Sequence, residues 1–206
     1  MLLFVTGASG SGKTVVIPGL RKRFPEFSVH DFDERCTPAP GDNRGRQEQT
    51  EYWISIAIEK QHLGKDTIVC GGAVYGEILA CPSIHQIAHL AVCLLDCSDL
   101  VRIERLRRHG GTPDMALLSW AAWLRVHAVD PGWSPEAITR DSYDSMHWEN
   151  WQAWEKGDPR WQQAVIDTTG KKVGQITAEV SRWIENQISR KDTRELPTMR
   201  GESDLL

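Results

Sequence analysis

The stretch GASGSGKT, Gly7 to Thr14, follows the short apolar run LLFVT near the start of the chain. Its spacing fits the pattern G-x-x-x-x-G-K-[ST], in which glycines let backbone N–H groups approach phosphate oxygens closely. The apolar run predicts a buried strand, and a helix is expected from Lys13 to about Arg23. A glycine-rich turn between a strand and the positive end of a helix predicts a phosphate-binding loop.

The residue types in this stretch indicate how the phosphates of a nucleotide would be held. Lys13 is expected to reach the outer phosphates, and the hydroxyl of Thr14 is expected to ligate Mg²⁺. The predicted nucleotide-binding residues of the loop are Gly7, Ser9, Gly10, Ser11, Gly12, Lys13 and Thr14. A bound nucleotide leaves three outcomes open: transfer of a phosphate to a small molecule, hydrolysis that drives motion, or binding alone.

Strands and helices are expected to alternate along most of the chain. After the first strand and helix, strand patterns occur in EFSVHDFDE, DTIVCGG, AHLAVCLLD and QQAVIDTTG. Helices are expected at residues 47–63, 98–109 and 174–188. Pro18 lies inside the first expected helix and predicts a kink there. This alternation predicts an α/β fold, a three-layer sandwich with a five-stranded parallel sheet.

The alternation fails between residues 110 and 160, where no strand pattern occurs. This segment is expected to be a helical insert that acts as a lid, within one domain of residues 1–189. The remaining stretch, residues 190–206, has no periodicity and is expected to be disordered.

Tryptophan is concentrated in and next to the expected insert of residues 110–160. Seven of the nine tryptophans lie between Trp120 and Trp161. Trp148, Trp151 and Trp154 recur every three residues and predict one face of a helix. Such a stripe packs as core, or it forms an aromatic wall for an acceptor or part of a lid that excludes water. The sequence leaves these alternatives open.

The composition is that of an ordinary globular protein of 206 residues, with 40% hydrophobic and 25% charged residues. The net charge of −4 argues against nucleic acid as a partner. No segment approaches the ~20 apolar residues of a membrane span, and MLLFV is too short for a signal peptide. The five cysteines form no C-x-x-C pair and are interpreted as reduced core residues of a cytoplasmic protein.

Two carboxylates follow the second expected strand, in the sequence HDFDE. Asp31 and Asp33 are two residues apart at the strand end. Both are therefore expected to point out of the carboxyl edge of the sheet, where ligands of open α/β folds bind. Phosphoryl transfer needs charge neutralisation and a group that orients the attacking oxygen. The two aspartates predict a transfer site, and an acidic cap of the loop is the alternative interpretation.

Other nucleotide-binding classes lack support in the sequence. The Asn-Lys-x-Asp signature of GTPases is absent, and motor or ABC-type ATPases need further signature motifs and usually a longer chain. With its phosphate loop and Asp-x-Asp, the chain from residue 1 to about 186 resembles the P-loop small-molecule and nucleotide kinases, such as shikimate kinase, gluconate kinase, adenylate kinase and chloramphenicol phosphotransferase. The resemblance implies ATP- and Mg²⁺-dependent transfer of the γ-phosphate to a hydroxyl group of a small-molecule acceptor.

The resemblance also implies roles on the acceptor side. In shikimate and gluconate kinases the first carboxylate of the Asp-x-Asp helps to hold magnesium, here Asp31, and the second binds or deprotonates the acceptor hydroxyl, here Asp33. Gly71 and Gly72 resemble the glycine run that contacts the acceptor of shikimate kinase, although this chain has Gly-Gly-Ala instead of three glycines, and a plain turn is the alternative. Two further residues are predicted to bind an anionic acceptor: Arg44 and Arg46.

On the nucleotide side, the resemblance to adenylate kinases implies that Arg105 packs on the adenine and that Arg108 contacts phosphates. Arginine suits both tasks, because its planar fork stacks on rings and binds phosphate through two hydrogen bonds; a solvated basic helix face is the alternative. Thr168 and Thr169, after the last expected strand, are candidates for contact with the edge of the adenine. Asp96 closes the run AVCLLD and either supports the sheet edge or belongs to the magnesium shell.

Three functions compete at this point. The first is a kinase of a metabolite, nucleoside or antibiotic. The second is a nucleotide or polynucleotide 5′-kinase, since polynucleotide kinases also place an arginine after the acids, here Arg35. The third is a nucleotide-binding regulator without transfer activity. The sequence identifies neither the acceptor nor the oligomeric state.

Overall fold

The computed structural model describes residues 1–194 and contains the five-stranded parallel sheet that the sequence predicts. The strand order is β2-β3-β1-β4-β5, with β1 in the centre. The strands are β1 (Leu2–Thr6), β2 (Ser28–Asp31), β3 (Thr67–Gly71), β4 (Leu90–Asp96) and β5 (Gln163–Asp167). Because all strands are parallel, the segments that follow them meet at one carboxyl edge.

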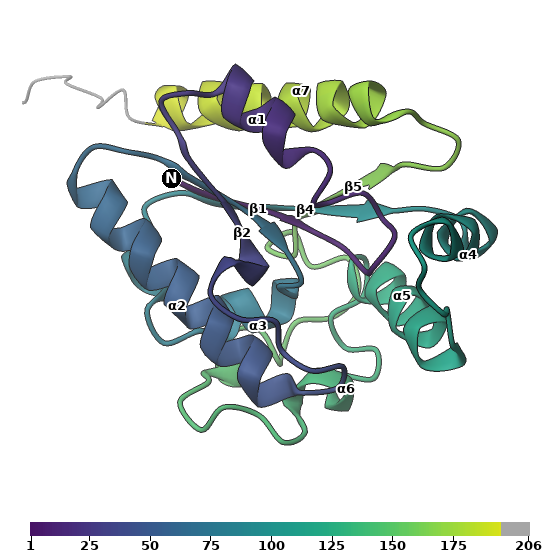
Figure 1. Ribbon diagram of the computed structural model, residues 1–206. Coiled ribbons are helices and arrows are strands. Elements are labelled where there is room, and N and C mark those ends of the chain that lie inside the picture. The colour runs from purple at the N-terminus through teal and green to yellow at the C-terminus, as the bar shows by residue number, and fades with distance from the viewer. Residues whose placement is uncertain (195–206) are drawn as a thin grey trace, which may run out of the picture.

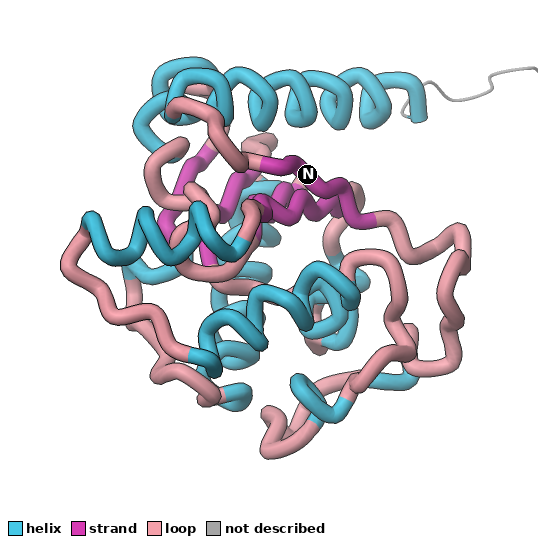
Figure 2. The backbone as a smooth tube through the Cα atoms, turned by 90° about the vertical axis from the view of Figure 1, so that its right-hand side faces the viewer, coloured by secondary structure: helices cyan, strands magenta, loops and turns pink. Residues whose placement is uncertain are grey.

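Helices cover both faces of this sheet (Figure 1). Helices α1 (Ile17–Arg23) and α7 (Val173–Arg194) lie on one face. The opposite face carries α2 (Asn43–His62), α3 (Tyr75–Ala80) and the insert. Figure 2 shows the single long α7 on one side of the strands and the larger mass of helices and loops on the other.

The central strand explains why two cores form. All five residues of β1 are buried, and successive side chains of a strand point to opposite faces. Leu3 and Val5 pack in the core under α1 and α7, whereas Leu2 and Phe4 pack in the core shared with α2, α3 and the insert.

The first helix differs from the prediction. Residues 13–16 form turns, and α1 begins only at Ile17. Pro18 therefore sits in the first helical turn, where its missing N–H would have no partner in any case. The predicted kink at Pro18 is wrong for this reason.

Other boundaries move by a few residues. Helix α2 begins at Asn43 rather than 47, because the Asp42 side chain accepts a hydrogen bond from the Gly45 N–H at 2.8 Å and caps the helix. The short α3 had no sequence signal that we recognised. Helix α7 continues to Arg194, so the prediction of disorder is wrong for residues 190–194, and the rest of the predicted tail, residues 195–206, lies outside the described residues. Three further elements lie outside the insert: the 3₁₀ turns η1 (Phe32–Glu34) and η2 (Ile84–Gln86) and the helix α4 (Asp99–Arg108).

The insert of residues 110–160 contains no strand, as predicted. It consists of α5 (Met115–His127), α6 (Glu136–Thr139), the 3₁₀ turn η3 (Trp148–Asn150) and loops. The predicted helix face of Trp148, Trp151 and Trp154 is wrong, since these residues lie in η3 and the turns after it. Packing as core is confirmed for Trp151, which is 1% exposed and lies in the same cluster as Phe4 of the sheet. A lid role for the insert stays a prediction.

The cysteines are free thiols, and four of the five are buried, as the sequence predicts. Cys36 is exposed, so the core interpretation is wrong for that residue. Within residues 1–194, none of the helices combines the length and the apolar character needed to cross a bilayer.

A buried histidine joins the insert to α3. His127 stacks on Trp123 with ring centroids 4.4 Å apart, and its Nε2 accepts a hydrogen bond from the Gly76 N–H at 3.3 Å. The rings of Trp151 and Trp161 make edge-to-face contacts with the His127 ring. Burial lowers the pKa of His127 to about 3, so the ring is neutral at pH 7.

We expect this histidine to make the fold sensitive to acid. An unfolded chain protonates His127 below pH 6.5, whereas the folded chain does so only near pH 3, so stability falls as the pH decreases through this window. At pH 5 the loss is about 2 kcal/mol. In urea unfolding between pH 7 and 5, His127→Gln should flatten this decrease, because Gln can still accept from Gly76 but does not titrate. His62→Gln, at an exposed position, should leave the slope unchanged; equal slopes in all three proteins would contradict the assignment.

The two glycines at the end of β3, Gly71 and Gly72, should differ sharply in their tolerance of a side chain. A Cβ at Gly71 would lie 1.8 Å from Cβ of Phe32, whereas a Cβ at Gly72 meets no atom within 4 Å. We expect Gly71→Ala to lower the free energy of unfolding by about 1–3 kcal/mol through overpacking, and Gly72→Ala to have little effect. Denaturant unfolding of both variants measures this, and similar losses would argue against the packing seen at Phe32.

Candidate functional site

The stretch from Gly7 to Thr14 forms a loop between β1 and α1, at the carboxyl edge of the sheet. Its first glycine is required by a close approach. Gly7 has φ of 151°, and a Cβ there would lie 2.4 Å from the Leu95 carbonyl oxygen and 2.5 Å from Ser11 Oγ. The backbone of the loop therefore fits against the end of β4 only with glycine at this position.

Side chains from distant elements hold three successive carbonyl groups of the loop. Arg102 donates to the Ser9 carbonyl at 2.7 Å, and Arg105 donates to the Gly10 carbonyl at 3.1 Å. The Thr168 hydroxyl lies 2.9 Å from the Ser11 carbonyl oxygen. These contacts come from α4 and from the residue after β5, so they hold the loop from behind.

The opposite side of the loop presents backbone N–H groups. In a planar trans peptide the N–H points away from the preceding C=O, so donors behind the Ser9 and Ser11 carbonyls direct the N–H groups of Gly10 and Gly12 the other way. Within residues 1–194, the N–H groups of Gly10, Gly12, Lys13 and Thr14 have no hydrogen-bond acceptor. Unpaired N–H groups that converge in such a loop form an anion-binding site.

Lys13 and the two predicted aspartates influence one another at this edge. Burial lowers the pKa of the Lys13 ammonium, and the charges of Asp33 and Asp31 oppose this shift. Asp33 reaches the surface, but partial burial raises the pKa of its carboxyl group, the Asp31 charge adds to the rise, and Lys13 opposes it. Asp31 Oδ1 also accepts a hydrogen bond from the Asp33 N–H at 3.1 Å, which caps η1. The structure thus brings together the phosphate loop and the two carboxylates.

No family model and no curated protein matches the sequence. Solved structures do match over nearly the whole chain. A sugar kinase from Janibacter sp. superposes with a TM-score of 0.58 at 15% identity, over 89% of this chain and 94% of that one. For a shikimate kinase from Aquifex aeolicus the TM-score is 0.50 at 13% identity, over 91% and 98% of the two chains. The chain has the P-loop kinase fold. An uncharacterized protein from Eubacterium ventriosum is also similar, with a TM-score of 0.51 at 11% identity over 90% and 98% of the chains.

Within the P-loop kinase fold, Arg105 and Thr168 support the loop from behind. Both Nη atoms of Arg105 donate to protein oxygens, among them the Thr168 hydroxyl at 2.9 Å and the Thr168 carbonyl at 2.6 Å. The Thr168 side chain is buried, so the predicted contact of this side chain with adenine does not agree with its placement. Thr169 accepts a hydrogen bond from the Ser98 N–H at 2.8 Å. Contact of adenine with the face of Arg105 or with Thr169 stays a prediction.

Arg102 of α4 supports the phosphate loop but was not among the predicted site residues. It is fully buried and pairs with Asp96 at 2.7 Å while it donates to Ser9. Its three-residue spacing from Arg105 was an available signal, because such residues share a helix face. Arg108, predicted to contact phosphates, is exposed and contacts no partner among residues 1–194; its role stays a prediction.

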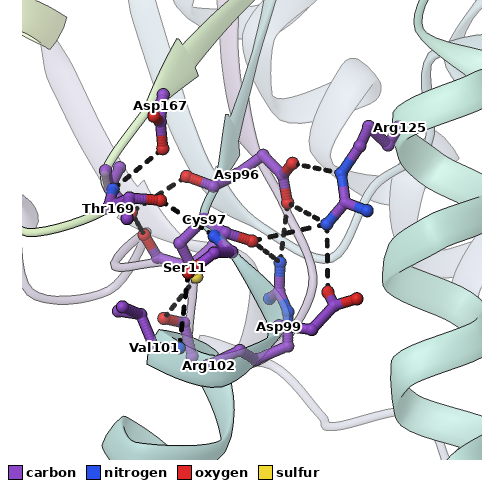
Figure 3. Close-up of polar contacts among 12 residues, drawn as sticks. Ser11, Asp96, Cys97, Asp99, Val101, Arg102, Arg125, Asp167 and Thr169 are labelled. Carbon is purple, nitrogen blue, oxygen red and sulfur yellow. Dashed lines mark hydrogen bonds and ion pairs between the residues drawn. The ribbon is translucent and has the colours of Figure 1, made fainter.

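Asp96 supports the sheet edge, which was one of its two predicted roles. One of its oxygens accepts from Arg102 and the other accepts from Arg125 of α5 at 2.6 Å (Figure 3). With both oxygens bound by guanidinium groups, Asp96 is poorly suited to hold magnesium.

Few of the described side chains of this protein are placed to ligate Mg²⁺. Residues 1–194 contain no group of three or more His, Cys, Asp or Glu that could hold a metal ion. Mg²⁺ commonly takes only one or two protein ligands and completes its shell with phosphate and water. Thr14 is exposed, and Asp31 has one oxygen with no partner in the part of the chain that the structure describes. These two predicted ligands fit a magnesium ion held mainly by a nucleotide.

The predicted acceptor arginines already face carboxylates. Arg46 binds Glu77 through two hydrogen bonds of 2.6 and 2.8 Å and lies over the Trp120 ring. Glu77 holds the pKa of Arg46 above its usual value, against the effect of burial. Arg44 pairs with Glu48 at 3.0 Å and is exposed. An anionic acceptor would have to compete with these carboxylates.

The two glycines predicted to contact the acceptor have different surroundings. Gly71 is packed against Phe32, so a packing constraint accounts for it, whereas Gly72 borders open space. Contact of Gly72 with an acceptor stays a prediction, and none is needed to explain Gly71.

The titration of Asp33 tests the arrangement at the carboxyl edge. Because the Asp31 charge raises the pKa of Asp33 and Lys13 lowers it, Asp31→Asn should move this pKa down and Lys13→Met should move it up. Side-chain ¹³C NMR of aspartate-labelled protein over pH 3–8 measures both shifts. Shifts of the same sign in the two variants, or none, would mean that these three groups do not share one site.

Proposed function

We propose that the protein is an ATP- and Mg²⁺-dependent phosphotransferase that moves the γ-phosphate to a hydroxyl group of a small molecule: a metabolite, a nucleoside or an antibiotic. The observation that carries this proposal is that two sets of groups lie at the same edge of the sheet. The first set is Lys13 and the loop N–H groups that have no acceptor among residues 1–194, and the second is Asp33, a carboxyl group of raised pKa. The first set suits a phosphate donor, and the second suits an acceptor hydroxyl.

The donor half acts by charge neutralisation. The N–H groups of the loop bind phosphate oxygens, and the Lys13 ammonium neutralises the outer phosphates. Bound Mg²⁺ would supply further neutralisation of the β- and γ-phosphate oxygens. Thr14 and Asp31 would hold it. The arginines behind the loop keep the N–H groups oriented before the nucleotide arrives, so little reorganisation is needed on binding.

The acceptor half centres on Asp33. In the proposed reaction the acceptor oxygen forms a bond to the γ-phosphorus, the bond between this phosphorus and the leaving ADP oxygen breaks, and the hydroxyl proton passes to the Asp33 carboxylate. A general base works best when its pKa is near the operating pH. The upward shift of the Asp33 pKa is in this direction.

The proposed partner is a small molecule, and its chemical identity is left to experiment. Arg35, the residue behind the polynucleotide alternative, lies over the Tyr52 ring at 4.5 Å. The free thiols agree with a reducing compartment, and we propose that the activity is cytoplasmic.

Substitution of Asp33 separates transfer from binding. We expect Asp33→Ala to reduce turnover by about 10²–10⁴-fold while the Kd of a non-hydrolysable ATP analogue changes little. Lys13→Ala should reduce turnover and weaken the analogue. A coupled assay of ADP release and calorimetry measure the two quantities, with Glu59→Ala, at an exposed position of α2, as the control. Full turnover in Asp33→Ala would contradict the proposed role of Asp33 as the proton acceptor.

The acceptor can be sought by thermal stabilisation. A panel of hydroxyl-bearing metabolites, nucleosides and antibiotics would be screened for a rise in Tm in the presence of the ATP analogue and Mg²⁺, since a ligand of the folded state raises its stability by mass action. Hits should then stimulate ADP release. If no compound raises Tm and no ATP is consumed, the phosphotransferase proposal fails.

A further inference from the structure

The insert and the phosphate loop are joined by a chain of three charged side chains (Figure 3). Arg125 of α5 donates through Nε to Asp96 Oδ2 at 2.6 Å. Arg102 donates to Asp96 Oδ1 at 2.7 Å and, through its other Nη atom, to the Ser9 carbonyl at 2.7 Å. A single carboxylate at the end of β4 therefore connects a helix of the insert with the backbone that would bind phosphate.

The loop end of this chain depends on Asp96. The Arg102 side chain is 0% exposed, and Asp96 is the only carboxylate paired with it among the described residues. A buried guanidinium needs a counter-ion, because removal from water without one is strongly unfavourable. The position of the Asp96 carboxylate thus determines where Arg102 can lie, and Arg102 holds the carbonyl that orients the Gly10 N–H.

The insert end of the chain orients Asp96. Arg125 contacts three groups of the β4–α4 connection: the Asp96 carboxylate, the Cys97 carbonyl at 3.4 Å and Asp99 at 3.1 Å. Asp96 and Asp99 together raise the pKa of Arg125, with the hydrogen bond to Asp96 as the main cause. Without Arg125, water would replace it at Asp96 Oδ2, and the carboxylate would lose the partner that fixes its plane.

We propose that Arg125 is a positioning residue that couples nucleotide binding at the phosphate loop to the ordering of α5 in the insert. The coupling rests on the proposed function, since it requires that a nucleotide occupies the loop. Arg125 itself need not touch the nucleotide. It acts through Asp96 and Arg102, and its 40% exposed side chain distinguishes it from a core residue whose loss would unfold the domain.

Thermodynamic linkage makes the coupling reciprocal. If order in α5 strengthens nucleotide binding, then nucleotide binding must stabilise α5 by the same free energy. A residue that merely fastens the insert would affect the stability of α5 equally with and without nucleotide. The response of α5 to a nucleotide is therefore the readout that separates coupling from simple support.

The test uses the full chain and a non-hydrolysable ATP analogue with Mg²⁺. Hydrogen exchange is measured by mass spectrometry for the wild type, Arg125→Ala and a matched control, Arg160→Ala. Arg160 also lies in the insert and forms an exposed ion pair, with Asp158, but has no contact with the β4–α4 connection. In the wild type and in the control, the analogue should slow exchange in residues 7–14 and in residues 115–127.

In Arg125→Ala we expect the analogue to protect residues 7–14 but not residues 115–127, and its Kd to rise by about fivefold or more. Arg125→Lys keeps the charge but has one donor group in place of a fork, so it should recover only part of the response and serves if the alanine variant does not fold. Asp99→Ala removes one contact of Arg125 and leaves Asp96, so it should retain most of the protection.

Each contrary result has a distinct meaning. If the wild type binds the analogue but α5 is not protected, or if Arg125→Ala gives the wild-type Kd and protection, the coupling is wrong while the proposed function stands. If the wild type does not bind the analogue at all, both the coupling and the proposed function fail.

Discussion

The backbone of the phosphate loop can present its N–H groups to an anion only if its carbonyl groups are bound on the other side. Arg102, Arg105 and Thr168 meet this requirement. Two of these side chains depend on further features of the fold. The buried Arg102 needs the carboxylate of Asp96 as a counter-ion, and Thr168 reaches the loop because it directly follows β5. The arrangement of β1, β4 and β5 is thus what places the donors behind the loop.

The same constraint gives the insert a place in the site. Arg125 brings α5 to Asp96, and His127, two residues later, accepts a hydrogen bond from Gly76 at the start of α3. At another point of the insert, the side-chain amide of Gln47 in α2 donates a hydrogen bond to the Ile138 carbonyl. The insert therefore contacts the segments that follow β3 and β4 and the start of α2, all of which border the carboxyl edge. Trp123 and Trp151 of the insert are buried in the core beside these contacts.

Charge is distributed unevenly around this edge. At the phosphate loop, Lys13 has no ion pair within 4 Å among residues 1–194 and is influenced by two aspartates. At the start of α2, Arg46 is neutralised by Glu77. A buried pair of this kind is unfavourable to break, because one partner would remain as an uncompensated charge. The structure thus leaves Lys13 without an ion-pair partner among the described residues and pairs the arginine that the sequence predicted to bind an acceptor.

The sequence by itself determined the phosphate loop, the Asp-x-Asp at the end of β2 and the parallel α/β architecture, because each depends on local spacing: glycines at fixed intervals, short apolar runs and the alternation of strand and helix patterns. The three-residue spacing of Arg102 and Arg105 is also a local pattern that predicts a shared helix face, but it does not say what that face contacts. Only the tertiary structure decided that Arg102 binds a carbonyl 93 residues away, that Glu77 neutralises Arg46 and that Trp151 is core. These pairings join segments that are far apart in the chain, and which segments meet is set by the packing of the whole sheet and insert rather than by any local pattern.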